Sequence, residues 1–144
     1  MTDLIVTTPK RDIALAAREA AGIIAAGGGS YFRLLSRRVV KVNAGNGDRM
    51  FYVEDGFIRG FANIIKIRFS RDGRGVSGVG EVCSTTGVNW GIGTFAIMDA
   101  ATWQWVLPVP CRGFQGWRYF YRFAEMVVVG DWRSPRPPIH PGLT

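Results

Sequence analysis

The spacing of hydrophobic and polar residues along the chain predicts one helix near the N-terminus, with strands around it. Residues 3–7 carry a short apolar run of strand type. From residue 9 to about residue 26, apolar side chains recur at helical spacing. Thr8 is placed to cap this helix, and Pro9 suits its first position, where the missing N–H costs nothing. Residues 27–29 are glycines, which end the helix.

The most informative stretch, residues 47–69, predicts a β-hairpin. Residues 50–53 form a short apolar and aromatic arm. Asp55 and Gly56 follow it, and this pair accepts the positive φ angles of a tight type I′ turn. Gly60, in the returning arm, marks a bulge or a close approach of another backbone.

The outer part of the returning arm, residues 65–69, alternates apolar side chains with Lys66 and Arg68. Since side chains alternate between the two faces of a strand, this pattern predicts one buried face and one basic, solvent-facing face.

Two stretches leave strand and helical turn as alternatives, namely residues 31–35 and residues 94–101. Residues 75–84 predict a strand weakened by glycines. Residues 85–93 predict a loop that carries the unusual pair Asn89 and Trp90. A tryptophan on a glycine-flanked loop indicates that it covers the core or contacts a ligand.

The C-terminal third predicts further strands. Trp103 and Trp105 alternate with polar or small residues and should share one face, with Pro108 and Pro110 ending that strand. Residues 117–129 predict the longest strand.

These elements add up to an α+β domain, residues 1–130, built as a small, mostly antiparallel β-barrel of about six strands with an N-terminal helix. Residues 131–144 hold four of the seven prolines and predict an extended C-terminal tail.

Charge points to an anionic partner. The chain has 144 residues and a formal charge of +7, from 18 basic and 11 acidic residues, and 15 of the basic residues are arginines. Arginine binds phosphate through a planar fork and stacks on bases. A basic, aromatic-rich small domain therefore favours RNA or DNA as partner. The alternative is that the arginines reflect genomic base composition or adaptation to heat.

Several classes of site are disfavoured. Cys83 and Cys111 lack the spacing of a zinc site, and His140 is the single histidine, so we expect no metal, no cofactor and no histidine-based catalysis. Residues 73–78 match the letters GxGxxG, but a hairpin turn explains them better than a dinucleotide site. No apolar run reaches the roughly 18 residues of a membrane span, and no signal peptide is visible, so a cytoplasmic setting is expected.

Short motifs give the chain a resemblance to the PUA-like superfamily, first to its EVE/YTH-like branch and then to its ASCH branch. The motifs are a Gly-Asp-Arg turn with a Phe-Tyr-Val strand at residues 47–53, the sequence Phe-Tyr-Arg at residues 120–122, the valines 127–129 and the prolines of residues 135–138. The first strand has Leu4-Ile5-Val6 where EVE-like domains usually have Tyr-Trp, and the ASCH pattern GxKxxExR is absent.

The resemblance implies a pocket in which aromatic side chains stack a base, with a basic rim along the nucleic-acid backbone. The candidates for the pocket are Asn89, Trp90, Trp103 and Trp105. The candidates for the rim are Arg37, Arg38, Lys41 and Arg49, with Lys66 and Arg68 beside them. The competing interpretation is core packing for the tryptophans, or a loop lid for Trp90, and an ordinary solvated surface for the cations.

Two other classes of function remain open from the sequence. A small hydrolase acting on modified nucleosides would need an acid or base, for which Glu54, Glu81 and Asp99 are the candidates, although no pair has diagnostic spacing. A self-associating interaction module would use the apolar stretch 119–129 as an exposed edge. We favour nucleic-acid binding, and binding over catalysis; the oligomeric state does not follow from the sequence.

Overall fold

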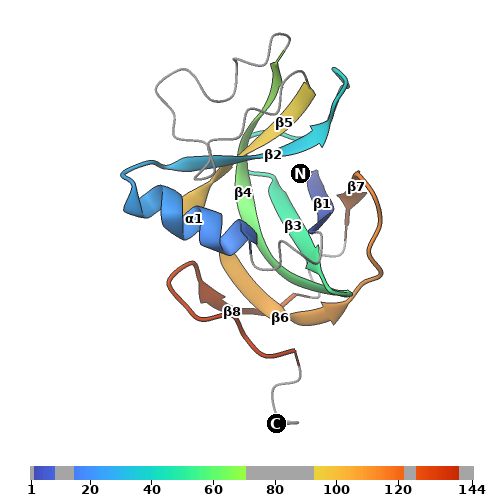
Figure 1. Ribbon diagram of the computed structural model, residues 1–144. Coiled ribbons are helices and arrows are strands. Elements are labelled where there is room, and N and C mark those ends of the chain that lie inside the picture. Colours follow the sequence, from blue (N-terminus) through green and yellow to red (C-terminus); the bar gives the residue numbers. More distant parts are fainter. Residues whose placement is uncertain (1, 9–14, 71–92, 122–125, 140–144) are drawn as a thin grey trace.

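The computed structural model describes residues 2–8, 15–70, 93–121 and 126–139 (Figure 1). The elements, in chain order, are β1 (Asp3–Thr8), α1 (Leu15–Ala25), β2 (Ser30–Ser36), β3 (Arg49–Glu54), β4 (Phe57–Ser70), β5 (Gly93–Asp99), the short 3-10 helix η2 (Ala100–Thr102), β6 (Gln104–Pro110), β7 (Trp117–Phe120) and β8 (Val128–Asp131). The described chain is therefore mostly β with a single α-helix.

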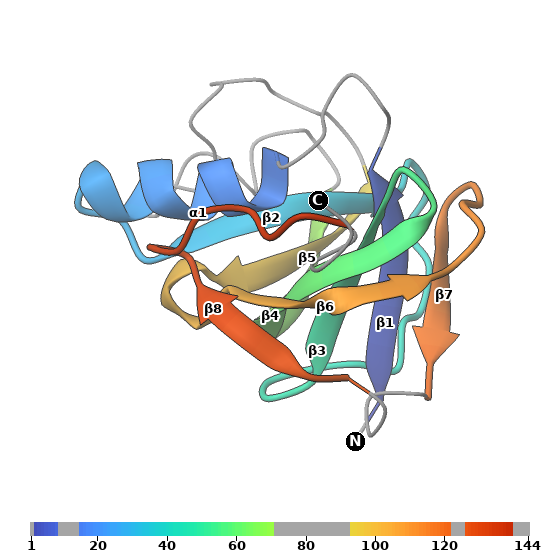
Figure 2. The ribbon, with the colours of Figure 1, turned by 90° about the horizontal axis from the view of Figure 1, so that it is seen from below.

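The strands form one mixed sheet that curls into a half-barrel (Figures 1 and 2). The strand order is β2-β5-β4-β3-β1-β7, with β6 paired to both β4 and β8. The pairing of β1 with β3 is parallel, whereas the other described pairings are antiparallel. The mostly β half-barrel is thus compatible with the predicted small barrel, and the predicted antiparallel arrangement is matched only in part, because the sheet is mixed.

Buried side chains lie on both faces of the sheet and form two large clusters, with a third, small one around Phe95 and Ile97. The larger part lies inside the curl, where α1 packs its alanines and Ile23 against side chains such as Met50 and Tyr52 of β3. The smaller part lies behind the sheet and includes Phe51 and Val53 of the same strand. Because side chains alternate along a strand, β3 supplies both parts of the core.

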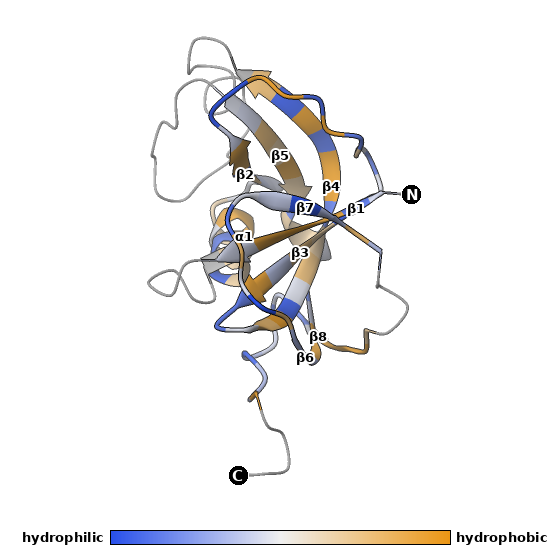
Figure 3. Cartoon of the chain, turned by 90° about the vertical axis from the view of Figure 1, so that its right-hand side faces the viewer, coloured by the Kyte–Doolittle hydropathy of each residue, from blue (hydrophilic) through white to orange (hydrophobic). Residues whose placement is uncertain are grey.

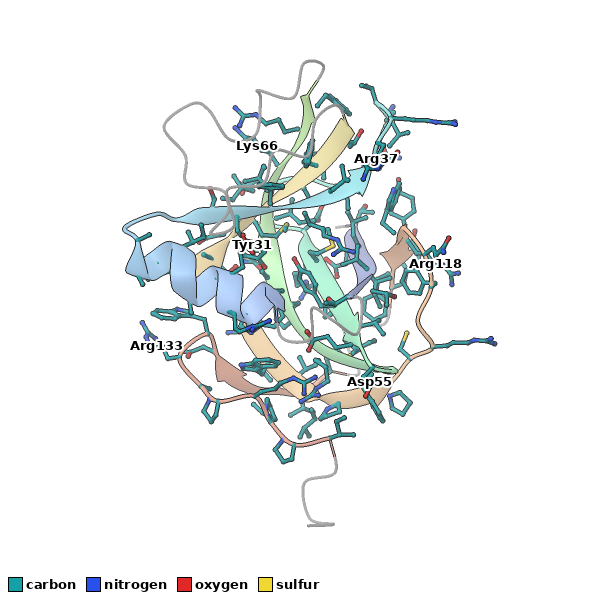
Figure 4. All side chains as sticks on the ribbon, in the orientation of Figure 1. Tyr31, Arg37, Asp55, Lys66, Arg118 and Arg133 are labelled. Atoms are coloured by element: carbon teal, nitrogen blue, oxygen red, sulfur yellow. The ribbon has the colours of Figure 1, made fainter. Side chains whose placement is uncertain are left out.

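The predicted central hairpin is β3 followed by β4. Its turn residues Asp55 and Gly56 have φ angles of 49° and 84°, the positive values that a type I′ turn needs at both central positions. Figure 4 labels Asp55 at this tip.

Gly60 is both a bulge residue and a site of close approach, as predicted. The register passes from Tyr52↔Gly60 to Val53↔Ile58, so Arg59 is an extra residue in β4. A Cβ atom at Gly60 would lie 2.5 Å from Cζ2 of Trp103 and 2.6 Å from the carbonyl oxygen of Gln104. Only glycine fits here, and the bulge is what lets β6 approach so closely.

The helix is confirmed over Leu15–Ala25, and the predicted first residues 9–14 lie outside the described part. Its predicted end at the glycine run is confirmed. The Gly27 N–H donates to Ile24 O at 3.0 Å, and the Gly28 N–H donates to Ile23 O at 2.8 Å. Gly27 has a φ of 84°, so the helix ends in a Schellman motif, whose left-handed residue is usually glycine.

The ambiguous stretches are now assigned. Residues 31–35 belong to strand β2, and residues 94–101 contain both alternatives, because β5 runs directly into η2. The predicted strand 75–84 and most of the predicted loop 85–93 lie outside the described residues.

Two strand predictions were wrong. Pro108 lies within β6 instead of ending it, whereas Pro110 is the last residue of the strand, as predicted. The register of β6 with β8 covers Gln104 to Val106, so the prolines occupy a stretch of β6 where that side is an edge and an N–H is not required. The predicted strand 117–129 is two strands, β7 on β1 and β8 on β6, placed at different edges of the sheet.

The outer half of β4 also departs from its predicted pattern. Figure 3 shows hydrophilic and hydrophobic residues alternating there. Nevertheless, Ile65 is 36% exposed and Phe69 is 48% exposed, so the predicted fully buried apolar face is wrong. A second register shift, between Ile64 and Lys66, interrupts the alternation at Ile65, and beyond it Ile67 is partly buried against the larger core.

Candidate functional site

The connection from β2 to β3 begins with residues 37–42, which we call the basic segment. Arg37, Arg38 and Lys41 are all exposed on it. The sequence from residue 30 to residue 47 contains no Asp or Glu that would neutralise them locally. The structure therefore brings three of the four predicted rim residues together on one surface segment.

The backbone of the basic segment is held by Thr94 of β5. The Thr94 hydroxyl donates to Arg38 O at 2.7 Å and accepts from the Val40 N–H at 3.0 Å, and Thr94 itself is fully buried. Gly93 permits this contact, since a Cβ there would lie 2.4 Å from Ser36 O. The cations thus project from a fixed backbone, which lowers the entropy lost when they bind a ligand.

Aromatic side chains of β7 adjoin the basic segment. The Asn43 N–H, just after the segment, donates to the Tyr119 hydroxyl at 3.1 Å. Tyr119 packs edge-on against Trp117, with ring centroids 5.0 Å apart. Tyr121 follows directly after β7 and is 79% exposed. The connection from β2 to β3 therefore reaches β7, although β2 and β7 are the first and last strands in the strand order. It brings the cations of the basic segment near the aromatic side chains of β7.

Arg49, the fourth predicted rim residue, has a different environment. Its Nη2 lies 3.2 Å from Oδ2 of Asp3, and the side chains are 17% and 7% exposed. The Arg49 backbone N–H also donates to Asp3, at 2.9 Å. This pair joins β1 to β3, so Arg49 has a structural role in the sheet and lies away from the exposed cations. Of the other candidates, Lys66 is exposed and Arg68 is half-buried on β4.

The two predicted pocket residues that the structure describes, Trp103 and Trp105, are core residues. Trp103 and Trp105 share one face of β6, as predicted, but both are buried in the larger core, at 1% and 3% exposure. Trp103 packs on Tyr52 at 5.3 Å and on Trp105 at 5.4 Å between ring centroids. In this arrangement neither ring offers a face to a base. Asn89 and Trp90 lie outside the described residues.

The core inside the curl contains a pair of tyrosines. The hydroxyl groups of Tyr31 and Tyr52 lie 3.3 Å apart, and both side chains are buried. Figure 4 shows Tyr31 beside α1. Burial, joined by repulsion from Tyr52, raises the pKa of Tyr31 well above its usual value. Burial also raises the pKa of Tyr52 to about 12.

These raised pKa values predict a loss of stability at alkaline pH. The folded state favours the neutral phenols, so their contribution is complete below the unfolded pKa of about 10 and falls as pH rises towards 12. For each tyrosine, we expect a slope of about 1.4 kcal/mol per pH unit in this range. Urea unfolding at a series of pH values checks this. The variant Tyr31→Phe/Tyr52→Phe should have a flatter profile, and an unchanged profile in that variant would contradict the assignment.

A buried charge cluster lies beneath the C-terminal segment, residues 132–139. Oε1 of Glu54, a side chain 1% exposed, lies 3.3 Å from Nη2 of Arg136. Arg59 is fully buried, and its Nη2 donates to the carbonyl oxygen of Pro137. The segment that composition predicted to be an extended tail therefore packs back on the barrel. Sequence reasoning missed Arg59; the signal was an arginine beside the predicted bulge glycine, within an apolar strand.

The two described carboxylates among the candidates for a hydrolase, Glu54 and Asp99, have separate structural roles. Glu54 belongs to the charge cluster, Asp99 accepts the Ala101 N–H at 3.2 Å and caps η2, and Glu81 lies outside the described residues. Within the described ranges, no three His, Cys, Asp or Glu side chains are placed to hold a metal ion. Cys111 is half-buried, whereas Cys83 is not among the described residues.

The remaining surface has two further features. In Figure 4 the labelled cations Arg37 and Lys66 lie at the top of the view, Arg118 at the right and Arg133 at the left. The edge strand β8 exposes Val128 and Val129, next to exposed Val127 and Leu107. This apolar edge is the feature that favours the self-association alternative.

Comparison with known proteins adds nothing to these observations. No protein-family model matches the chain, no curated protein matches its sequence, and no solved structure matches its fold. Among the described residues, no helix is long and apolar enough to cross a membrane.

Proposed function

We propose that this domain binds single-stranded RNA or DNA, with the phosphate backbone on the basic segment and a base on the exposed aromatic edge of β7. The observation that carries the proposal is the grouping of Arg37, Arg38 and Lys41 on a backbone fixed by Thr94. Phosphate contacts of this kind supply most of the affinity for nucleic acid without regard to sequence.

The neighbouring tyrosines supply the second element of such a site. Single-stranded nucleic acid binds where a positive surface adjoins aromatic rings on which bases stack, each stacked base contributing roughly 1–3 kcal/mol. Tyr121 is the most exposed of the large hydrophobic side chains on the described surface, and Tyr119 is joined to the end of the basic segment through Asn43. These two tyrosines therefore support β7 as the stacking surface in this proposal, in place of Trp103 and Trp105, two of the four pocket residues that the sequence suggested.

The mostly β half-barrel with one helix is compatible with the PUA-like resemblance, and we propose that the chain is a PUA-like domain of the EVE/YTH-like kind. A modified base is the ligand that this resemblance implies. Asn89 and Trp90 stay candidates for recognising such a base. The choice between RNA and DNA is an outcome of the experiment that follows.

The test is a titration of fluorescently labelled single-stranded RNA and DNA oligonucleotides, followed by anisotropy. For the variant Arg37→Gln/Arg38→Gln/Lys41→Gln, we expect a loss of affinity of at least about tenfold. Loss of three phosphate contacts should also make the salt dependence of log K shallower by about 2, at roughly 0.7 for each contact on a single strand.

A charge-matched control separates a local surface from general attraction to a basic protein. The variant Arg18→Gln/Arg112→Gln/Arg133→Gln removes three exposed cations from α1, the connection after β6 and the turn after β8. It should keep nearly the affinity of the wild type. Equal losses in the two triple variants would show that net charge, and not the basic segment, accounts for binding. Absence of binding at low salt would rule out the proposed function.

A further inference from the structure

The buried charge cluster contains hydrogen-bond donors that are not satisfied. Arg59 is 0% exposed, and its Nε and Nη1 find no hydrogen-bond acceptor within the described part of the chain. Its third nitrogen, Nη2, donates to Pro137 O. Leaving a buried donor without an acceptor is unfavourable, most of all for a charged group, so such groups in folded proteins normally have a partner.

Two indole N–H groups in the neighbouring core share this property. The Nε1 atoms of Trp103 and Trp105 are buried and, again among the described residues, have no acceptor. The guanidinium carbon of Arg59 lies 6.0 Å from the centroid of the Trp105 ring. Guanidinium and indole nitrogens are donors with no accepting capacity. The unmet donors of Arg59 and of the neighbouring Trp105 therefore call for a ligand that accepts hydrogen bonds.

The charges of the cluster indicate the sign and the magnitude of the charge on that ligand. Arg59 and Arg136 are cations and Glu54 is an anion, which leaves one net positive charge in a largely dehydrated place. Burial lowers the pKa of Arg59, and the nearby Arg136 lowers it further, while Glu54 acts in the opposite direction. One added negative charge would neutralise the cluster and relieve the repulsion between the two arginines.

The cluster is also reachable from outside. The Arg136 side chain is 32% exposed and lies over Glu54, so it connects the buried groups to solvent. The covering segment leaves β8 and runs below β6, at the lower end of the molecule in Figure 1, whereas Arg37 lies at the upper end in Figure 4. This place is thus distinct from the basic segment.

We propose that Arg59, Arg136 and the Trp105 indole form a binding site for a singly charged oxyanion, a phosphate or carboxylate group of a small molecule, covered by the C-terminal segment. Arg59 sits at the inner end because the β-bulge beside Gly60 inserts it into β4 as an extra residue. Bulges commonly redirect a side chain in this way next to a functional site. Arg136 completes the site at the rim, and the anion takes up the donors that are otherwise unmet.

The experiment is a titration of the full chain with sodium phosphate and, separately, with sodium acetate, at constant ionic strength balanced by chloride. Tryptophan fluorescence and the melting temperature are followed together. We expect a saturable fluorescence change and a higher melting temperature with at least one of the two anions. Saturation by phosphate alone or by acetate alone identifies which oxyanion group the site takes.

Variants locate the response. Arg136→Gln should weaken the apparent Kd at least about tenfold, Arg59→Met should abolish the response, and the control Arg112→Gln, at an exposed arginine, should behave like the wild type. If Arg59→Met does not fold, Trp105→Phe removes one of the unmet N–H groups while keeping an aromatic ring, and should weaken binding. Oligonucleotide binding through the basic segment should persist in Arg136→Gln, which separates the two proposals.

The proposal is overturned if neither anion gives a saturable response up to about 10 mM, ten times a millimolar Kd. It is also overturned if a folded Arg59→Met retains the response of the wild type, or if Arg136→Gln and Trp105→Phe both bind as tightly as the wild type.

Discussion

Replacing Glu54 with glutamine is expected to lower the free energy of unfolding by up to about 3–5 kcal/mol, the range for removing one partner from a fully buried ion pair, because Glu54 and Arg59 are buried while Arg136 is partly exposed. Glu54 is 1% exposed and faces Arg136 at 3.3 Å. Glutamine keeps the shape but removes the charge, so the fully buried Arg59 and its neighbour Arg136 are left as two uncompensated cations. Against a total stability of about 5–15 kcal/mol, this is a large fraction.

Chemical denaturation of three variants checks this expectation. Asp131→Asn is the matched control, because it removes the carboxylate from an exposed ion pair with Arg133. The side chain of Arg133 is 70% exposed and that of Asp131 is 41% exposed. That change should cost no more than about 1 kcal/mol. Adding Arg59→Met to Glu54→Gln should recover part of the lost stability, since it also removes the buried cation. Equal, small losses for Glu54→Gln and Asp131→Asn would contradict a buried, charged cluster.

Replacing Trp103 with alanine is expected to cost about 3–5 kcal/mol, the range measured for removing large aromatic side chains from protein cores. Trp103 is among the largest fully buried side chains and touches Tyr52 and Trp105. It also fills the space left open by Gly60. Removing the indole leaves a cavity between α1 and the sheet that the rigid strands around it cannot close.

The matched control for this loss is Trp132→Ala, because Trp132 is only half-buried, against the outside of the same core. Its loss should be clearly smaller, since less apolar area returns to water. Melting curves for both variants give the comparison. If Trp103→Ala were as stable as the wild type, then Trp103 would not be the core residue described here, and its assignment as a stacking surface would return.

Much of the fold could be predicted because local sequence determines it. The turn at Asp55 and Gly56 requires two positive φ angles, and few residue pairs accept them. The glycine run ends α1 for a related reason, since Gly27 takes a left-handed conformation. The shared face of Trp103 and Trp105 follows from the alternation of a strand.

The errors arose where a residue's place depends on distant strands. Residues 117–129 look like one apolar strand, yet β7 joins β1 and β8 joins β6, a choice that only tertiary pairing makes. Pro108 lies inside β6, where the sequence predicts a strand end, because the sequence does not reveal that one side of β6 is an edge there. The bulge at Ile65 likewise interrupts the strict alternation from which the sequence predicted one buried face of β4.

The candidate site was predicted in part for similar reasons. Clustering along the chain was enough to identify Arg37, Arg38 and Lys41 as neighbours on one surface. It could not show that Arg49 is engaged by Asp3, a residue 46 positions away. Nor could it show that Arg136 pairs with Glu54, a residue 82 positions away. This pair belongs to the charge cluster and joins the C-terminal segment to the barrel.

The most direct test of nucleic-acid binding by the basic segment is a two-dimensional NMR titration with a short single-stranded oligonucleotide. We predict that the backbone amide signals of residues 37–43 and 119–121 move first, while the indole N–H signals of Trp103 and Trp105 stay in place. Movement of those two indole signals without change at residues 37–43 would contradict the account, as would a spectrum that does not respond at all.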